Sequence, residues 1–129
     1  LTPDTSYFYR VRAFNGVGPS LYSNTASATT DDDPPPDPPA APSGLTAIAA
    51  SSDTIDLSWE DNADNETGFF IQRRIASTSF VTVASVGANT VSYPISSLDS
   101  NTEYFFRVYA WNGDGDSAMS NVASATTLP

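Results

Sequence analysis

The sequence contains no cysteine, no histidine and no lysine. The chain therefore has no thiol nucleophile, no imidazole base, no Schiff-base amine and none of the usual zinc ligands except carboxylates. It also lacks any apolar run of 18 or more residues, so no segment is predicted to enter a membrane. These absences exclude most catalytic mechanisms, and we expect that this chain is not an enzyme.

Basic residues are scarce. All five are arginines, and they stand against 15 acidic residues, which gives a net charge of −10. Nucleic-acid binding begins with phosphate neutralisation, and an anionic membrane surface repels a chain of this charge in the same way, so neither partner is expected. Hydrophobic residues make up 40% of the 129 positions and charged residues 16%, which predicts a globular chain of one domain or one domain plus a piece of another.

An internal repeat organises the chain. Residues 1–30 align without a gap with residues 98–127, at a constant offset of 97. The identical pairs include Leu1/Leu98, Tyr7/Tyr104, Arg10/Arg107, Gly18/Gly115 and Asn24/Asn121. The chain therefore contains two copies of one unit, and only the last third of the unit is present in the first copy.

Residues 31–42 separate the two copies and are rich in aspartate and proline. Six of these twelve residues are proline and four are aspartate. Proline removes backbone donors and favours the extended polyproline conformation, while the like charges repel one another. We expect a stiff spacer with a reach of up to about 37 Å, at ~3.1 Å per residue.

From residue 43 onward, short alternating segments lie between turn-forming clusters. Residues 54–60 alternate strictly, with Ile55, Leu57 and Trp59 on one face. Strands are predicted at 45–49, 54–60, 69–75, 80–86, 91–95, 103–112 and 121–127. Seven short strands of this kind predict an all-β sandwich.

Four runs of residues resemble the fibronectin type III family. Three of them are Pro-Ser-Gly-Leu at 42–45, Leu-Ser-Trp at 57–59 and Gly-Phe-Phe-Ile-Gln-Arg-Arg at 68–74. The fourth consists of Leu98, Thr102, Tyr104, Arg107, Val108, Ala110 and Asn112. The resemblance implies a complete seven-stranded immunoglobulin-like sandwich over residues 43–129. It further implies that residues 1–30 are the C-terminal F–G hairpin of a truncated copy, with 31–42 as the linker.

The resemblance also assigns structural roles. Leu98 and Tyr104 are similar to the tyrosine corner of the family, in which a phenol hydroxyl bonds back to the preceding connection. Tyr7 would do the same in the first copy. Trp59 is expected at the centre of the core.

One face of the predicted sandwich is a candidate binding surface. Strand parity places Tyr104, Phe106, Val108 and Ala110 inward, and the resemblance places the third and sixth strands in one sheet. The outward set is then Phe70, Arg74, Phe105, Arg107, Tyr109 and Trp111. Two interpretations stay open: a platform that stacks on sugars or anchors a protein partner, and cross-strand pairs that stabilise the sheet or pack on a neighbouring module.

Acidic loops form a second constellation. Asp61, Asp64, Asp114 and Asp116 lie in two loops that the topology places at one pole of the sandwich. Calcium takes oxygen ligands from such loops, but these residue types are also ordinary in turns. We predict no metal and no cofactor, with calcium at these four residues as the alternative.

The resemblance implies a non-catalytic spacer or adhesion segment of tandem modules from a larger exported protein, located outside the cell or at its surface. The Asp-rich loops and linker are similar to prokaryotic secreted members. The expected partners are neighbouring domains of the same polypeptide, and a polysaccharide or a cell-surface protein. One alternative is an accessory carbohydrate-contacting module of a secreted polysaccharide-degrading enzyme; another is a filament subunit completed by strand exchange.

Overall fold

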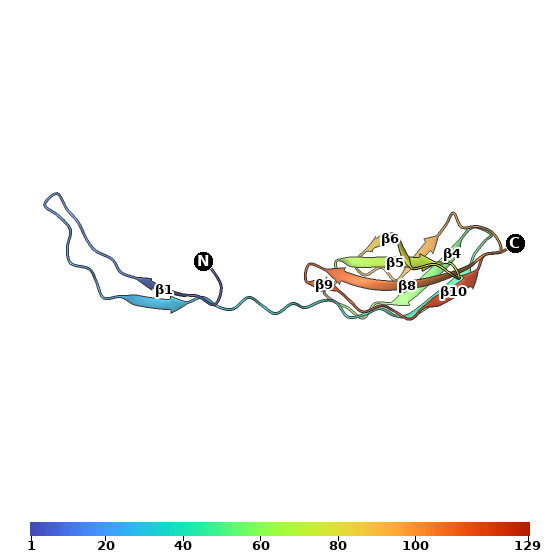
Figure 1. Cartoon of the computed structure of the whole chain (residues 1–129), viewed down its shortest axis with the longest axis horizontal. Helices are drawn as coiled ribbons and strands as arrows, with labels where there is room; N and C mark the ends of the chain where they lie inside the picture. Colours follow the sequence, from blue (N-terminus) through green and yellow to red (C-terminus); the bar gives the residue numbers. More distant parts are fainter. The chain divides into compact units, whose positions relative to one another are not determined.

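A computed structural model describes all 129 residues. The chain forms two compact units, Leu1–Pro35 and Pro36–Pro129. Both units are built from antiparallel strands, ten in all, without a helix (Figure 1). No helix long and apolar enough to span a membrane is therefore present.

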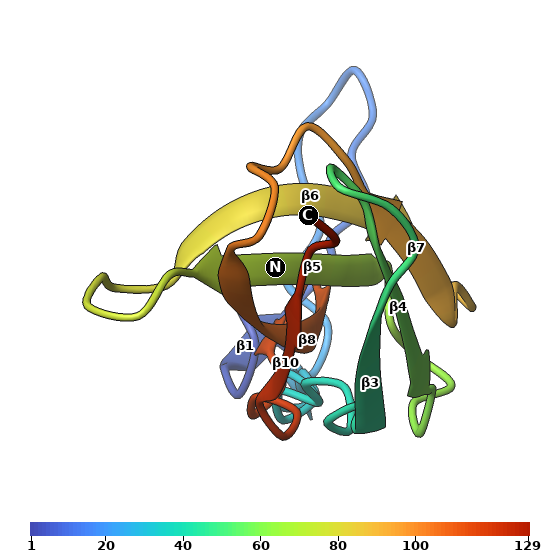
Figure 2. The same cartoon turned by 90° about the vertical axis from the view of Figure 1, so that its right-hand side faces the viewer.

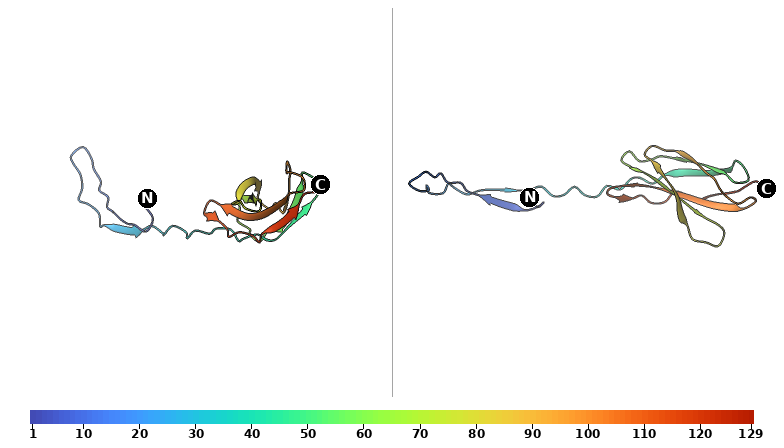
Figure 3. Two further views of the ribbon diagram at one scale, coloured as in Figure 1. Left: turned by 45° about the vertical axis from the view of Figure 1, so that its right-hand side comes forward. Right: turned by 90° about the horizontal axis from the view of Figure 1, so that it is seen from above.

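The second unit is a sandwich of two sheets. One sheet has the order β3-β4-β7, from β3 (Ser43–Ala49), β4 (Ile55–Glu60) and β7 (Ser92–Ile95). The other has the order β10-β8-β5-β6, from β5 (Gly68–Arg74), β6 (Val81–Gly87), β8 (Glu103–Asn112) and β10 (Ala123–Thr126), with the short β9 (Gly115–Asp116) paired to the end of β8. Figures 2 and 3 show the two sheets as layers. All seven predicted strands are present, with ends that differ by at most two residues.

Alternating residues from both sheets fill the space between them. In β4, Ile55, Leu57 and Trp59 are buried while their neighbours are exposed, as the sequence pattern predicted. The buried apolar residues are Leu45, Ile55, Leu57, Trp59, Phe69, Ile71, Ile95, Leu98, Tyr104, Phe106, Val108 and Ala110. The prediction of an all-β immunoglobulin-like sandwich is confirmed.

The first unit is a long hairpin. Its strands β1 (Ser6–Tyr9) and β2 (Ala26–Thr29) pair antiparallel, and a bridge joins Phe14 and Pro19 nearer the tip. Hydrogen bonds of this hairpin recur 97 residues later. Thr30 Oγ1 accepts from Thr5 N at 3.1 Å, and Thr127 Oγ1 accepts from Thr102 N at 3.0 Å. The repeat in sequence is therefore also a repeat in conformation.

The two copies differ in what covers their inner face. Leu98 and Val108 are 6% and 0% exposed, whereas their counterparts Leu1 and Val11 are 89% and 71% exposed. The hairpin thus carries the core residues of a sandwich without the facing sheet, and an isolated two-stranded hairpin is at best marginally stable in water.

The Asp/Pro-rich segment is divided between the two units. Asp31 O accepts a hydrogen bond from Asp4 N at 3.3 Å, within the first unit. Pro39 and Pro42 are buried within the second. The domain limits at 30/31 and 42/43 stay predictions, and the second compact unit begins at Pro36.

Candidate functional site

The outer face of β5 and β8 has the register expected from the sequence. Along β8, buried and half-buried residues alternate from Tyr104 to Trp111. β5 pairs with β8 so that Phe70 lies opposite Tyr109 and Arg74 opposite Phe105. The six candidate residues therefore share one face, on which each of them is half-buried.

Three aromatic rings pack together at one end of this face. The Phe70 ring centroid lies 5.5 Å from that of Trp111, with an interplanar angle of 28°, and 5.4 Å from that of Tyr109. Offset stacking of this kind is favourable beyond the burial of area alone. We call Phe70, Tyr109 and Trp111 the aromatic stack.

Trp111 also packs on the backbone of β5 at Gly68. A Cβ atom at Gly68 would lie 3.2 Å from Trp111 Nε1 and 2.3 Å from Val86 O, so glycine is required there. The indole Nε1 is buried without a hydrogen-bond partner. This edge of the ring is covered by the sheet, and only the remaining ring surface is open to a ligand.

The other end of the face is made of arginines lying on rings. Arg74 lies 4.1 Å above the Phe105 ring, and Arg107 lies 4.2 Å above the Phe80 ring. Arg107 Nε also donates to Gln72 Oε1 at 2.7 Å. Such cation–π contacts stabilise the surface by about 0.5–1 kcal/mol each where exposed.

The sequence reasoning missed Phe80 as a member of this face. Phe80 precedes β6, and the pairing of Arg73 with Val81 places it beside Arg74. A register shift between Ile71 and Gln72 alters the alternation along β6, so counting by twos from the middle of that strand gives the wrong face. The available signal was an aromatic residue directly after the turn at 77–79.

The acidic loops bring together no group of three or more side chains suited to hold a metal. Asp114 Oδ2 accepts a hydrogen bond from Asp37 N at 3.3 Å, whereas Asp61 Oδ1 accepts one from Ala63 N at 3.0 Å. Asp64 and Asp116 are exposed. The absence of a bound metal stays a prediction, with calcium at these four residues as the alternative.

Asp61 instead pairs with Glu66. Burial is the largest cause that raises the pKa of Asp61, and the charge of Glu66 raises it further. Burial also raises the pKa of Glu66, but hydrogen bonds from its own backbone, from Asn89 N and from Asp61 outweigh this effect and leave the pKa of Glu66 lowered.

The structural residues form the predicted corner in both copies. Tyr104 OH accepts a hydrogen bond from Asp99 N at 3.0 Å, and Tyr7 OH accepts one from Thr2 N at 2.8 Å. A side-chain hydrogen bond with Thr2 is the largest cause that lowers the pKa of Tyr7, and this backbone bond lowers it further. Leu98, next to Asp99, is buried in the core.

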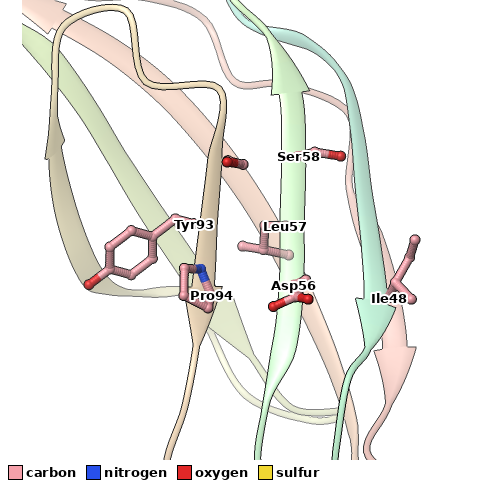
Figure 4. A pocket seen from close by; sticks show the side chains of 7 residues that line it. Ile48, Asp56, Leu57, Ser58, Tyr93 and Pro94 are labelled. Atoms are coloured by element: carbon pink, nitrogen blue, oxygen red, sulfur yellow. The ribbon is translucent and has the colours of Figure 1, made fainter.

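A shallow depression of about 360 Å³ lies on the outer face of the other sheet (Figure 4). Ile48 and Tyr93 flank it, Pro94 lies beside Tyr93, and Asp56 supplies its one carboxylate.

The geometry defines an immunoglobulin-like β-sandwich with a tyrosine corner. The sequence model of the family "Fibronectin type III domain" matches residues 40–126. The chain belongs to the fibronectin type III family.

Relatives of the chain are found in large proteins. It is 34% identical to Titin of Drosophila melanogaster over 84% of the chain and 1% of that protein. It is 33% identical to Chitinase A1 of Niallia circulans over 98% of the chain and 18% of that protein. It is also 33% identical to Neogenin of Mus musculus, over 96% of the chain and 8% of that protein. The chain thus spans less than a fifth of the length of these curated relatives.

Solved structures show the same fold. The structure of chicken CNTN1 FN1-FN3 domains matches all of this chain and 43% of that chain, with a TM-score of 0.65 and 26% identity. A Fn3-like protein from Clostridium thermocellum matches 70% of this chain and 94% of that chain, with a TM-score of 0.59 and 25% identity.

Proposed function

We propose that this chain is a non-catalytic segment of tandem fibronectin type III modules in a larger exported protein, where it spaces other domains and contributes an adhesion surface. Fibronectin type III domains are generally non-catalytic modules. The neighbouring domains of the same polypeptide are its first partners.

The observation that carries this proposal is the recurrence of one hairpin at two places in the chain. The recurrence extends to side chain–backbone bonds: Ser23 Oγ accepts from Val11 N at 3.0 Å, and Ser120 Oγ accepts from Val108 N at 2.9 Å. Two copies of the same unit joined by a short segment form an array, and an array of compact modules sets a distance between what lies before it and after it.

Three of the side chains that could serve as acids or bases have structural roles instead. With no histidine, cysteine or lysine, only carboxylates and tyrosines are available at neutral pH. The hydroxyl of Tyr104 fixes the corner. Glu66 Oε1 accepts from Asn89 N, and Asp53 Oδ1 accepts from Ser51 Oγ at 2.6 Å. Each of these groups holds a loop in place.

A second candidate function is contact with a polysaccharide through the aromatic stack. Aromatic rings on one face favour it, and the similarity to Chitinase A1 adds support. The half-burial of all three rings and the covered indole nitrogen argue against a wide platform.

Retention on insoluble polysaccharides tests the two functions against each other. A spacer is recovered in the unbound fraction on chitin, cellulose and xylan, with the parent chain and Tyr109→Ala/Trp111→Ala behaving alike. If the parent chain is retained and the double variant is not, the polysaccharide-binding function is favoured and the spacer function is contradicted. Ile48→Ala, on the opposite sheet face, is the matched control.

A further inference from the structure

The two acidic loops at one pole of the sandwich hold the chain segment that precedes it. Asn65 Nδ2 donates to Asp37 O at 3.0 Å and to Asp37 Oδ2 at 3.2 Å. Asn112 Nδ2 donates to the same carbonyl at 3.0 Å, and Asp37 N donates to Asp114 Oδ2 at 3.3 Å. Both backbone polar groups of Asp37 are thus satisfied by side chains of the loops at 62–67 and 112–116.

The residues that follow are held as well. Asn62 Nδ2 donates to Ala41 O at 2.9 Å. Pro39 is buried, and Pro38 lies against Gly115, where a Cβ atom would be 3.6 Å from Pro38 Cγ. Gly115 has a φ of +145°, which L side chains rarely adopt, so the backbone conformation at this contact favours glycine.

We propose that these loops are a docking site for the extended segment 37–41, so that the stiff part of the sandwich begins at Asp37 rather than at Ser43. The docked segment is this chain's own Asp-Pro-Pro-Ala-Ala sequence at 37–41, and the loops recognise it through hydrogen bonds to the carbonyl and amide of Asp37. The loops whose carboxylates were the alternative calcium ligands here bind the backbone of a proline-rich segment.

The docking shortens the free connection between the two copies. Asp31 is bonded to Asp4 within the first unit, which leaves Asp32–Pro36 between the last and first held residues. Five residues at ~3.1 Å each reach about 16 Å, against about 37 Å for the twelve residues of the whole segment. The importance of this shorter joint for spacing rests on the proposed function, whereas the docking itself does not.

Backbone ¹⁵N relaxation of the full chain tests the docking. In the parent we expect the Asp37 amide to have an order parameter of about 0.85, like the strands, and the Asp33 amide one below about 0.6. In Asn65→Ala/Asp114→Ala, which removes three of the four bonds to Asp37, the order parameter of the Asp37 amide falls below about 0.6. The strand amides report that the sandwich stays folded.

The matched control is Asp64→Ala/Asp116→Ala, from the same two loops but without bonds to residues 37–41, and it leaves the Asp37 amide rigid. An Asp37 amide that is mobile in the parent overturns the proposal, and so does one that stays rigid in Asn65→Ala/Asp114→Ala. If that double variant unfolds, Asn65→Ala alone removes two bonds and is read in the same way. Polysaccharide retention bears only on the proposed function, so the two can fail separately.

Discussion

The side chain of Asn121 brackets the backbone of Leu45. Its Oδ1 accepts from Leu45 N at 2.9 Å, and its Nδ2 donates to Leu45 O at 3.0 Å. This pair of bonds ties the segment before β10 to β3, which belongs to the other sheet. Asn24, the counterpart of Asn121 in the first copy, is exposed.

Asn121→Ala is expected to destabilise the sandwich by about 1–3 kcal/mol, because two hydrogen bonds worth roughly 0.5–1.5 kcal/mol each are lost. Urea unfolding followed by tryptophan fluorescence measures the change. Asn24→Ala is the matched control and should leave the transition where it is. Equal effects of the two variants would show that the bracket contributes nothing to stability.

Trp59→Ala should leave the sandwich largely unfolded. Trp59 is 5% exposed, and its ring centroid lies 5.8 Å from that of Phe69. Truncation of a buried tryptophan costs about 3–5 kcal/mol out of the ~5–15 kcal/mol typical of a domain. Circular dichroism with temperature checks this. A cooperative melt within a few degrees of the parent would contradict the assigned core.

Most of what the sequence could predict about the sandwich came from the alternation of inward and outward residues along the strands. Burial alternates along 104–111, and period two together with the register to the core residues of the other strands predicts the inner and outer faces of β8. The corner formed by Tyr104 followed from the resemblance, because the residue and its spacing recur together.

The remaining features depend on contacts that composition does not encode. Phe80 reaches the arginine end of the face through an irregular register, which cannot be located from residue types. The docking of Asp37 depends on two amides from distant loops meeting at one carbonyl. Proline and aspartate content predicted an extended segment but not the surface on which it lies.

The aromatic stack should be more important for stability than a typical surface group. If Trp111 were an ordinary exposed residue, Trp111→Ala would lower the free energy of unfolding by no more than about 0.5 kcal/mol. Because Trp111 is half-buried against Phe70 and Gly68, we expect a larger loss. A double-mutant cycle of Phe70→Ala and Trp111→Ala should give a coupling of about 0.5–1.5 kcal/mol. Additive effects would show that the stacked geometry is not energetically important.

The Asp61–Glu66 pair predicts a pH dependence. Because the pKa of Asp61 is raised in the folded state, its stabilising contribution is complete below its unfolded pKa and is lost as the pH rises through its folded pKa. Glu66→Gln removes the neighbouring charge, so the pKa of Asp61 should fall toward its usual value, although burial keeps it raised. Carboxyl ¹³C titration measures this. An unchanged titration of Asp61 would show that burial alone sets its pKa.

The last prediction tests whether the two copies are interchangeable. In a chimera, residues 98–129 of the sandwich are replaced by residues 1–32, so that Val11 takes the place of Val108 and Asn24 that of Asn121. The matching hydrogen bonds of the two hairpins and the apolar inner face of the first lead us to expect a cooperatively folded sandwich.

Tyr9 would replace Phe106, which is 0% exposed, and would bury a hydroxyl without a partner at a cost of about 1–3 kcal/mol. The chimera should therefore melt below the parent, and Tyr9→Phe within it should recover part of the loss. Val11→Asp, which places a charge in the core, should abolish folding. In the chimera Arg12 and Phe14 take the places of Tyr109 and Trp111 of the aromatic stack. A chimera that shows no cooperative transition even with Tyr9→Phe, Arg12→Tyr and Phe14→Trp would contradict the assignment of residues 1–30 as the closing hairpin of a sandwich.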